Sequence, residues 1–223
     1  VIRRLTRHGE TVIAAPGGRG GFGNVQRREN NEGRPGISVD VILEFGILAD
    51  IFIVGLPNAG KSQFLHAISN SKVKVTDHPF TTRIPCLGTY TTEDYRDIVF
   101  CELPSLLRGS AHGKGIGNRF LKHVANAKMI MYYLDPVSRF ASDLVDAYKT
   151  IRDELNAVDP VFTEKDIVVA IAKIDQIDRD HFAEAVDLLE SRLPTYCISP
   201  HTGEGIDALL GYIIEEMKKK AEL

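Results

Sequence analysis

The sequence predicts an α/β fold in which helices cover a mostly parallel sheet. From about residue 47 to the end, apolar runs of strand length alternate with segments of helical periodicity, the pattern of a doubly wound sheet. Residues 55–62 read GLPNAGKS and fit G-x-x-x-x-G-K-[ST], the pattern of a phosphate-binding loop. The two observations together predict a P-loop NTPase.

The context of the loop supports a phosphate site. Residues 50–54 (DIFIV) form an apolar run of strand length, and residues 63–68 (QFLHAI) have apolar side chains at helical spacing. Glycines let backbone N–H groups surround phosphate oxygens, and the following helix directs its positive end at the anion. We therefore expect Lys61 to contact the β- and γ-phosphates and the Ser62 hydroxyl to bind Mg²⁺. The alternative, an ordinary glycine-rich turn, is disfavoured by the flanking strand and helix.

The composition limits the classes of protein to which the chain can belong. The 223 residues could form one large domain or a main domain with an appendage, and 43% apolar with 26% charged residues is ordinary for a globular chain. The net charge of −3 means that any RNA contact needs local basic patches. The three cysteines are far apart, which favours a reducing compartment. No apolar run is long enough to predict a membrane span. Because the first residue is valine, we interpret the chain as a fragment or a trimmed protein.

Residues 1–45 differ in amino-acid composition from the rest of the chain. Residues 10–15 could form a strand, and five of the eight residues from 16 to 23 are glycine. So much glycine is too costly in entropy for the interior of a helix or strand. Spacing alone favours a flexible linker. The alternative is a packed polyproline-II-like segment that presents Arg19, Arg27 and Arg28 to RNA phosphates.

The remaining elements follow in order. Strands are predicted at residues 39–45, 50–54, 87–91, 97–101, 129–134, 167–172 and 195–199. Helices are predicted from the phosphate loop to about residue 70 and at residues 118–124, 141–157, 182–193 and 206–219. Ligands of such sheets bind at the carboxyl ends of the strands, where the motifs below fall.

Several motifs together resemble the Obg family of ribosome-associated GTPases. Residues 55–62 match its phosphate loop, and residues 77–82 (DHPFTT) resemble its first switch, D-Y-P-F-T-T. Residues 15–24 resemble the end of its glycine-rich domain, residues 108–124 its second switch, and residues 202–206 the loop before its last helix. The resemblance implies a divergent member with a truncated glycine-rich domain at residues 1–45 and a Ras-like G domain at residues 46–223. It also favours polyproline-II packing of residues 16–24.

The resemblance implies a GTP-binding factor that acts in assembly of the large ribosomal subunit and hydrolyses GTP slowly. The expected cofactors are Mg²⁺ and GTP or GDP, and the expected partners are the large subunit, its rRNA and other assembly factors. The expected location is intracellular, in an organelle such as the mitochondrion or in a bacterial cytoplasm, with the organelle favoured because motif drift is easier to tolerate there.

The family roles carry over residue by residue. Lys61 and the switch threonine, Thr81 or Thr82, are the candidate catalytic residues, and Ser62, Thr82 and Glu102 are the candidate Mg²⁺ ligands. Asn58 resembles the asparagine that holds a monovalent cation in K⁺-activated GTPases, which makes K⁺ a candidate cofactor. The candidate nucleotide contacts are Asn58, Ala59, Gly60, Lys61, Ser62, Gln63, Lys173, Asp175, Ser199 and Pro200.

Three motifs depart from the family pattern. Residues 102–105 (ELPS) replace D-x-P-G, so Glu102 extends the carboxylate by about one methylene, and Ser105 brings a Cβ that hinders backbone reorientation. Residues 172–175 (AKID) replace N-K-x-D, and Ala172 lacks a hydrogen-bonding anchor worth about 1–3 kcal/mol. Pro200 replaces an alanine and removes a backbone N–H. These changes predict impaired turnover.

Two function classes remain. The intact phosphate loop and Asp175, which can accept two hydrogen bonds from guanine, favour a slow GTPase. The departures favour a degenerate pseudo-GTPase that serves as a structural assembly factor on the large subunit. Asp175 disfavours a P-loop ATPase. His78 is an unfavoured catalytic candidate, and Asp135 is expected to cap a loop rather than to act in catalysis.

Overall fold

The computed structural model describes residues 3, 5, 9–21, 33–42, 49–69, 85–106, 108–109, 124, 127–178 and 182–221. The predictions for the first switch, including Thr81 and Thr82, lie outside the described residues, as do His78, Arg27, Arg28 and nearly all of residues 110–124. The chain divides into two compact units, Val1–Gly46 and Ile47–Leu223.

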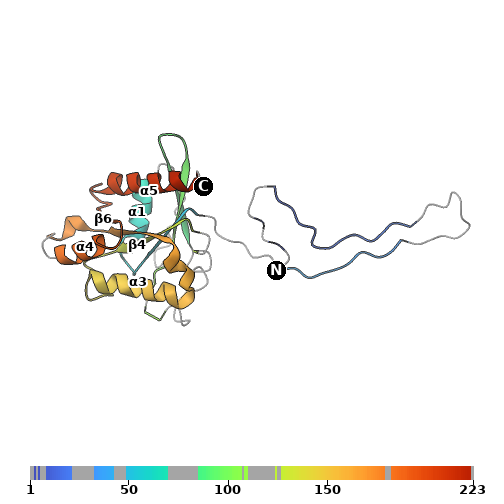
Figure 1. Ribbon diagram of the computed structural model, residues 1–223, viewed down its shortest axis with the longest axis horizontal. Coiled ribbons are helices and arrows are strands. Elements are labelled where there is room, and N and C mark those ends of the chain that lie inside the picture. Colours follow the sequence, from blue (N-terminus) through green and yellow to red (C-terminus); the bar gives the residue numbers. More distant parts are fainter. Residues whose placement is uncertain are drawn as a thin grey trace, which may run out of the picture. The chain divides into compact units, whose positions relative to one another are not determined.

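The second unit is built on a six-stranded sheet in the order β2-β3-β1-β4-β5-β6 (Figure 1). The strands are β1 (Ile51–Gly55), β2 (Cys86–Thr91), β3 (Asp97–Glu102), β4 (Met129–Leu134), β5 (Asp166–Ile171) and β6 (Thr195–Cys197). Only β2, paired with β3, is antiparallel in this described sheet. The prediction of an α/β fold with a mostly parallel sheet is confirmed.

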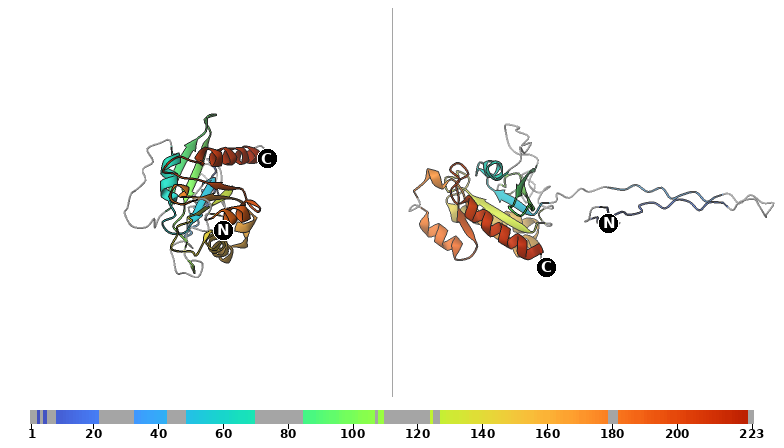
Figure 2. Two further views of the ribbon diagram at one scale, coloured as in Figure 1. Left: turned by 90° about the vertical axis from the view of Figure 1, so that its left-hand side faces the viewer. Right: turned by 90° about the horizontal axis from the view of Figure 1, so that it is seen from above.

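Helices cover both faces of the sheet (Figures 1 and 2). The helices α1 (Lys61–Ile68) and α5 (Ile206–Ala221) cover one face, and α3 (Leu144–Val158) and α4 (Ala183–Glu190) cover the other. Short 3₁₀ helices, η2 (Pro160–Glu164) and η3 (Ile174–Gln176), follow α3 and β5. Among the described residues, no helix combines the length and apolarity that a membrane span requires.

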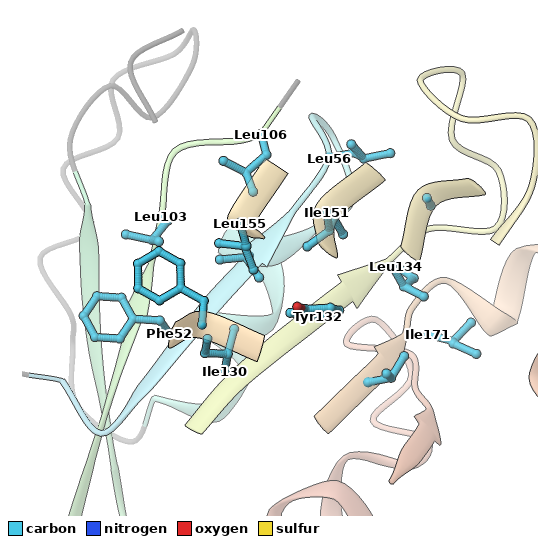
Figure 3. Packing of buried hydrophobic residues seen from close by; sticks show 14 of the residues in the cluster. Phe52, Leu56, Leu103, Leu106, Ile130, Tyr132, Leu134, Ile151, Leu155 and Ile171 are labelled. Atoms are coloured by element: carbon cyan, nitrogen blue, oxygen red, sulfur yellow. The ribbon is translucent and has the colours of Figure 1, made fainter. Parts of the chain in front are cut away.

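The two central strands are apolar on both sides because helices cover both faces. Phe52, Ile130 and Tyr132 point to the α3 face and pack near Ile151 and Leu155 (Figure 3). The intervening residues of β1 and β4 point to the opposite face, as the alternation of a strand requires. Continuous apolar runs of this kind are typical of a parallel sheet that is buried on both sides.

Some predicted boundaries were wrong. Residues 39–42 form no strand, and residues 43–45 lie outside the described part. The predicted strand at residues 195–199 ends at Cys197, because the Ser199 N–H donates to the Glu204 carbonyl (2.9 Å) and its hydroxyl accepts from the Thr202 N–H (3.1 Å). Helix α3 begins at residue 144 because Asp143 caps it by accepting a hydrogen bond from the Asp146 N–H.

The first unit contains two extended segments, residues 9–21 and 33–42, and the strand predicted at residues 10–15 does not form. The Arg34 N–H donates to the Arg19 carbonyl (2.8 Å), and the Ile37 N–H donates to the Pro16 carbonyl (3.2 Å). A Cβ at Gly18 would lie 1.7 Å from the Arg34 carbonyl oxygen. The glycines therefore allow close backbone pairing between the two described segments, although their side chains are almost all exposed.

Candidate nucleotide-binding site

The phosphate loop joins the end of β1 to the start of α1, as the motif predicts. Gly60 precedes the helix with a φ of 96°, a left-handed conformation that glycine adopts without steric cost. The Phe64 N–H donates to the Gly60 carbonyl (3.0 Å) and closes the first turn. The free N–H groups of this turn point towards the loop, which makes the helix start suitable for an anion.

Lys61 is folded back against its own loop. Its ammonium donates to the Gly55 carbonyl (3.2 Å), to the Leu56 carbonyl (3.0 Å) and to the Ser105 hydroxyl (3.0 Å). The residue is 3% exposed, and this burial lowers the pKa of Lys61 to about 8, partly offset by the nearby Glu102 carboxylate. A phosphate group would add further negative charge beside this buried ammonium.

Glu102 ends β3 beside the phosphate loop, where the sequence predicts a metal ligand. Burial raises the pKa of Glu102, while a hydrogen bond with Ser62 and the charge of Lys61 partly offset this effect. Its Oε2 atom is buried and has no hydrogen-bond partner among the described residues. A carboxylate oxygen and an adjacent hydroxyl are hard oxygen donors of the kind that Mg²⁺ prefers, so Glu102 and Ser62 fit this ion.

The segment after Glu102 lies against the phosphate loop. The Leu103 N–H donates to the Ile53 carbonyl, and the Leu106 N–H donates to the Gly55 carbonyl, both at 3.1 Å. Leu106 is fully buried in the core (Figure 3), so its side chain does not face a nucleotide. Ser105 lies between these two anchors, and its contact with Lys61 was not anticipated from the sequence.

A cavity of about 230 Å³ lies where the base of a nucleotide is expected. It is lined by Gln63, Lys173, Asp175, Gln176, Pro200 and His201. The structure thus brings Gln63, in the first turn of α1, together with the predicted base-recognition residues, and adds Gln176 and His201. Ser199 is fully buried and its hydroxyl holds the following turn, so its side chain does not line this cavity.

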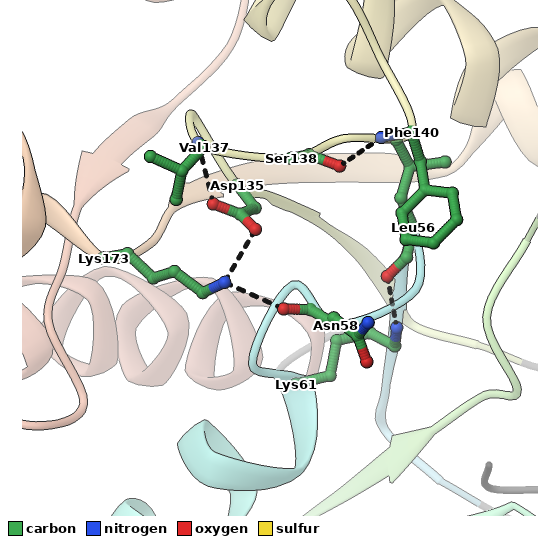
Figure 4. A network of polar contacts seen from close by, with 8 residues as sticks. All are labelled: Leu56, Asn58, Lys61, Asp135, Val137, Ser138, Phe140 and Lys173. Atoms are coloured by element: carbon green, nitrogen blue, oxygen red, sulfur yellow. Dashed lines mark hydrogen bonds and ion pairs between the residues drawn. The ribbon is translucent and has the colours of Figure 1, made fainter. Parts of the chain in front are cut away.

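Lys173 connects the base-recognition loop with the phosphate loop (Figure 4). Its ammonium donates to the Asn58 carbonyl (2.9 Å) and to Asp135 Oδ2 (2.7 Å). Asp135 Oδ1 also accepts a hydrogen bond from the Val137 N–H (2.9 Å), which is the loop-capping role expected for it. The ion pair with Lys173 was not expected. The signal that could have revealed it is position, because Asp135 follows β4 and Lys173 follows the adjacent parallel strand β5.

The comparisons with known proteins agree with this geometry. Residues 50–173 match the family model described as "50S ribosome-binding GTPase". The chain is similar to GTPase Obg of Cytophaga hutchinsonii, with 34% identity over 226 residues, which cover 98% of this chain and 66% of that protein. The chain therefore spans just under two thirds of the length of this curated relative.

Solved structures share the fold. One is Era in complex with MgGDPNP and nucleotides 1506–1542 of 16S ribosomal RNA, with a TM-score of 0.57, 23% identity, and coverage of 74% of this chain and 55% of that chain. Another is the G domain of the T. maritima FeoB iron transporter, with a TM-score of 0.54, 20% identity, and coverage of 76% and 98% respectively. These similarities place the second unit among G domains by fold.

Proposed function

The chain belongs to the family of 50S ribosome-binding GTPases, and from this premise we propose that it binds guanine nucleotide and hydrolyses GTP slowly during assembly of the large ribosomal subunit. One observation carries the proposal. The cavity is lined by Gln63, which follows the phosphate loop in the first turn of α1, together with the base-recognition residues Lys173 and Asp175. A nucleotide that fills it would reach Lys61 and Ser62 with its phosphates.

Each residue has a role that follows from its chemistry. Lys61 would neutralise the β- and γ-phosphates, and the exposed Asp175 would accept hydrogen bonds from the guanine edge. Glu102 and Ser62 would hold Mg²⁺, which supplies charge neutralisation to the phosphates. Slow turnover follows because the buried Leu106 presents no group that could orient an attacking water.

A ribosomal partner is supported by the description of the family, which names the 50S ribosome. We also propose that K⁺ stimulates hydrolysis, because Asn58 occupies the loop position at which related GTPases hold a monovalent cation. Faster hydrolysis in KCl than in NaCl of equal ionic strength is the expected result, and equal rates would contradict this part of the proposal.

The second candidate is a scaffold that does not turn nucleotide over. The contact between Ser105 and Lys61 favours it, because the ammonium that should contact phosphate is already occupied by a residue of the segment that follows β3. The two candidates differ in hydrolysis and share the same binding surface, so one series of measurements separates them.

The experiment is equilibrium binding of GTP, GDP and ATP in the presence of Mg²⁺, followed by single-turnover hydrolysis with and without large ribosomal subunits. Lys61→Ala tests the site, and Lys149→Ala, an exposed lysine on α3, is the matched control. Micromolar binding of GTP or GDP that only Lys61→Ala abolishes, with measurable hydrolysis, is the expected result. Absence of binding, or binding that Lys61→Ala does not change, would refute the proposal.

A further inference from the structure

Three loops that matter for nucleotide binding meet at one ion pair. Asp135 follows β4, Lys173 follows β5, and Asn58 belongs to the phosphate loop. The parallel register pairs Leu134 with Ile171, and the Ala172 N–H donates to the Leu134 carbonyl (2.8 Å). The backbone therefore sets the two loops side by side before any side chain is considered.

The side chain at residue 172 cannot join these loops. Ala172 is 1% exposed, and its methyl group offers no hydrogen bond to the phosphate loop. A buried polar side chain at this position could have made such a bond. In this chain the connection between the base-recognition loop and the phosphate loop is instead made by Lys173, through its ammonium and the Asn58 carbonyl.

Asp135 is placed to hold that ammonium. The side chain of Asp135 is 3% exposed and that of Lys173 is 23% exposed, so the 2.7 Å ion pair is largely shielded from water. Both carboxylate oxygens are used, Oδ1 by the Val137 N–H and Oδ2 by Lys173 (Figure 4). A carboxylate fixed in this way can orient a lysine more firmly than a solvated one can.

The backbone of Lys173 shows why it needs to be held. Its φ of 58° lies in the left-handed region, which a residue with a Cβ rarely adopts and which costs about 1 kcal/mol or more. Asp175 is two residues further along the same turn. A lysine released from Asp135 would let this turn relax, and the carboxylate that reads guanine would lose its fixed position.

We propose that Asp135 is a positioning residue for guanine-nucleotide binding. By holding Lys173 against the phosphate loop, it supplies the connection between loops that Ala172 does not make. This inference rests on the proposed function and extends it to a residue outside the recognised motifs. Asp135 acts through Lys173 and touches no reacting atom.

The variant Asp135→Asn tests the inference. Asparagine can still accept the hydrogen bond from the Val137 N–H, but it cannot form an ion pair with Lys173. The matched control is Asp159→Asn, because Asp159 caps the Val161 N–H (3.0 Å) in the same way and no lysine of the described residues contacts its carboxylate. We expect release of a fluorescent GDP analogue to become faster by about tenfold or more in Asp135→Asn and to stay unchanged in Asp159→Asn. The preference for GTP over ATP should fall in the same variant.

A second variant separates positioning from a general loss of structure. Ala172→Asn adds a side chain that can bond to the phosphate loop directly, so GDP release should slow in this variant. In the Ala172→Asn background, the effect of Asp135→Asn on GDP release should shrink several-fold, because the two connections serve the same purpose. Independent effects that simply add would overturn the inference, even if Asp135→Asn alone proved unstable.

The two proposals fail in different ways. If the wild-type chain binds GDP and Asp135→Asn releases it at the wild-type rate with unchanged base preference, the inference is wrong and the proposed function stands. If the wild-type chain binds no guanine nucleotide, the proposed function is wrong and the inference falls with it.

Discussion

Ser105→Gly is the substitution that most directly tests why turnover should be slow. The Ser105 hydroxyl accepts a hydrogen bond from the Lys61 ammonium, which also donates to the Gly55 and Leu56 carbonyls. A hydrogen bond to a charged group contributes about 1.5–3 kcal/mol, and a phosphate must displace this one. Glycine adds backbone entropy that costs about 0.5–1 kcal/mol in an ordered segment. The difference is about 1 kcal/mol, so GTP should bind roughly fivefold more tightly.

A second variant separates the hydroxyl from the Cβ. Ser105→Ala removes the competing hydroxyl but keeps the Cβ, so it should tighten GTP binding without faster hydrolysis. Ser105→Gly should do both, because the backbone at residue 105 then becomes free to reorient towards a γ-phosphate. Titration with a fluorescent GTP analogue and single-turnover hydrolysis at saturating GTP measure the two effects. Unchanged affinity in both variants, together with unchanged hydrolysis in Ser105→Gly, would refute this reasoning.

Three further predictions follow from burial and close contact. Because burial raises the pKa of Glu102, the contribution of Glu102 to the free energy of unfolding falls as pH rises above about 4.5. In urea unfolding without Mg²⁺ or nucleotide, the free energy of unfolding of Glu102→Gln should therefore exceed that of the wild type at pH 7.5, and the difference should disappear towards pH 4.5. A difference that stays constant with pH would contradict this prediction. Because the pKa of Lys61 is lowered to about 8, GDP binding should take up a proton and weaken above that pH, and a GDP affinity that does not fall with rising pH would contradict this. Gly18→Ala should speed hydrogen exchange at the Arg34 amide, whereas Gly17→Ala, whose Cβ would have no neighbour within 4 Å, should not.

The sequence predicted the strands well where burial on both faces dictated an apolar run, as in β4 and β5. The strand prediction failed where an apolar segment has no neighbouring strand with which to pair. Residues 39–45 looked like a strand because Val39, Val41 and Ile42 are β-branched, but these side chains are exposed and residues 39–42 join no sheet. A strand depends on pairing as well as on propensity, and pairing is not visible in a local pattern.

The candidate site was predictable where phosphate chemistry constrains neighbouring residues. Lys61, Ser62 and the glycines of the loop must be close in sequence because one loop surrounds one anion. The contacts of Lys61 with Ser105 and of Lys173 with Asp135 join residues that are 44 and 38 positions apart. Such contacts depend on the strand order β3-β1-β4-β5, which only the folded sheet reveals.

The two unexpected contacts bear on different steps of the proposed cycle. On the base side, the ion pair of Asp135 with Lys173 replaces a missing connection, so the departure at Ala172 need not cost binding. On the phosphate side, the Ser105 hydroxyl competes with phosphate for Lys61 at a cost of about fivefold in affinity. The Cβ of Ser105 hinders backbone reorientation, and the buried Leu106 offers no group that could orient a water. The base-side change is therefore compensated, whereas the phosphate-side changes act together against turnover. This asymmetry implies that the chain should retain guanine-nucleotide affinity better than hydrolysis rate, which is the behaviour of a switch that stays in its GTP state for a long time.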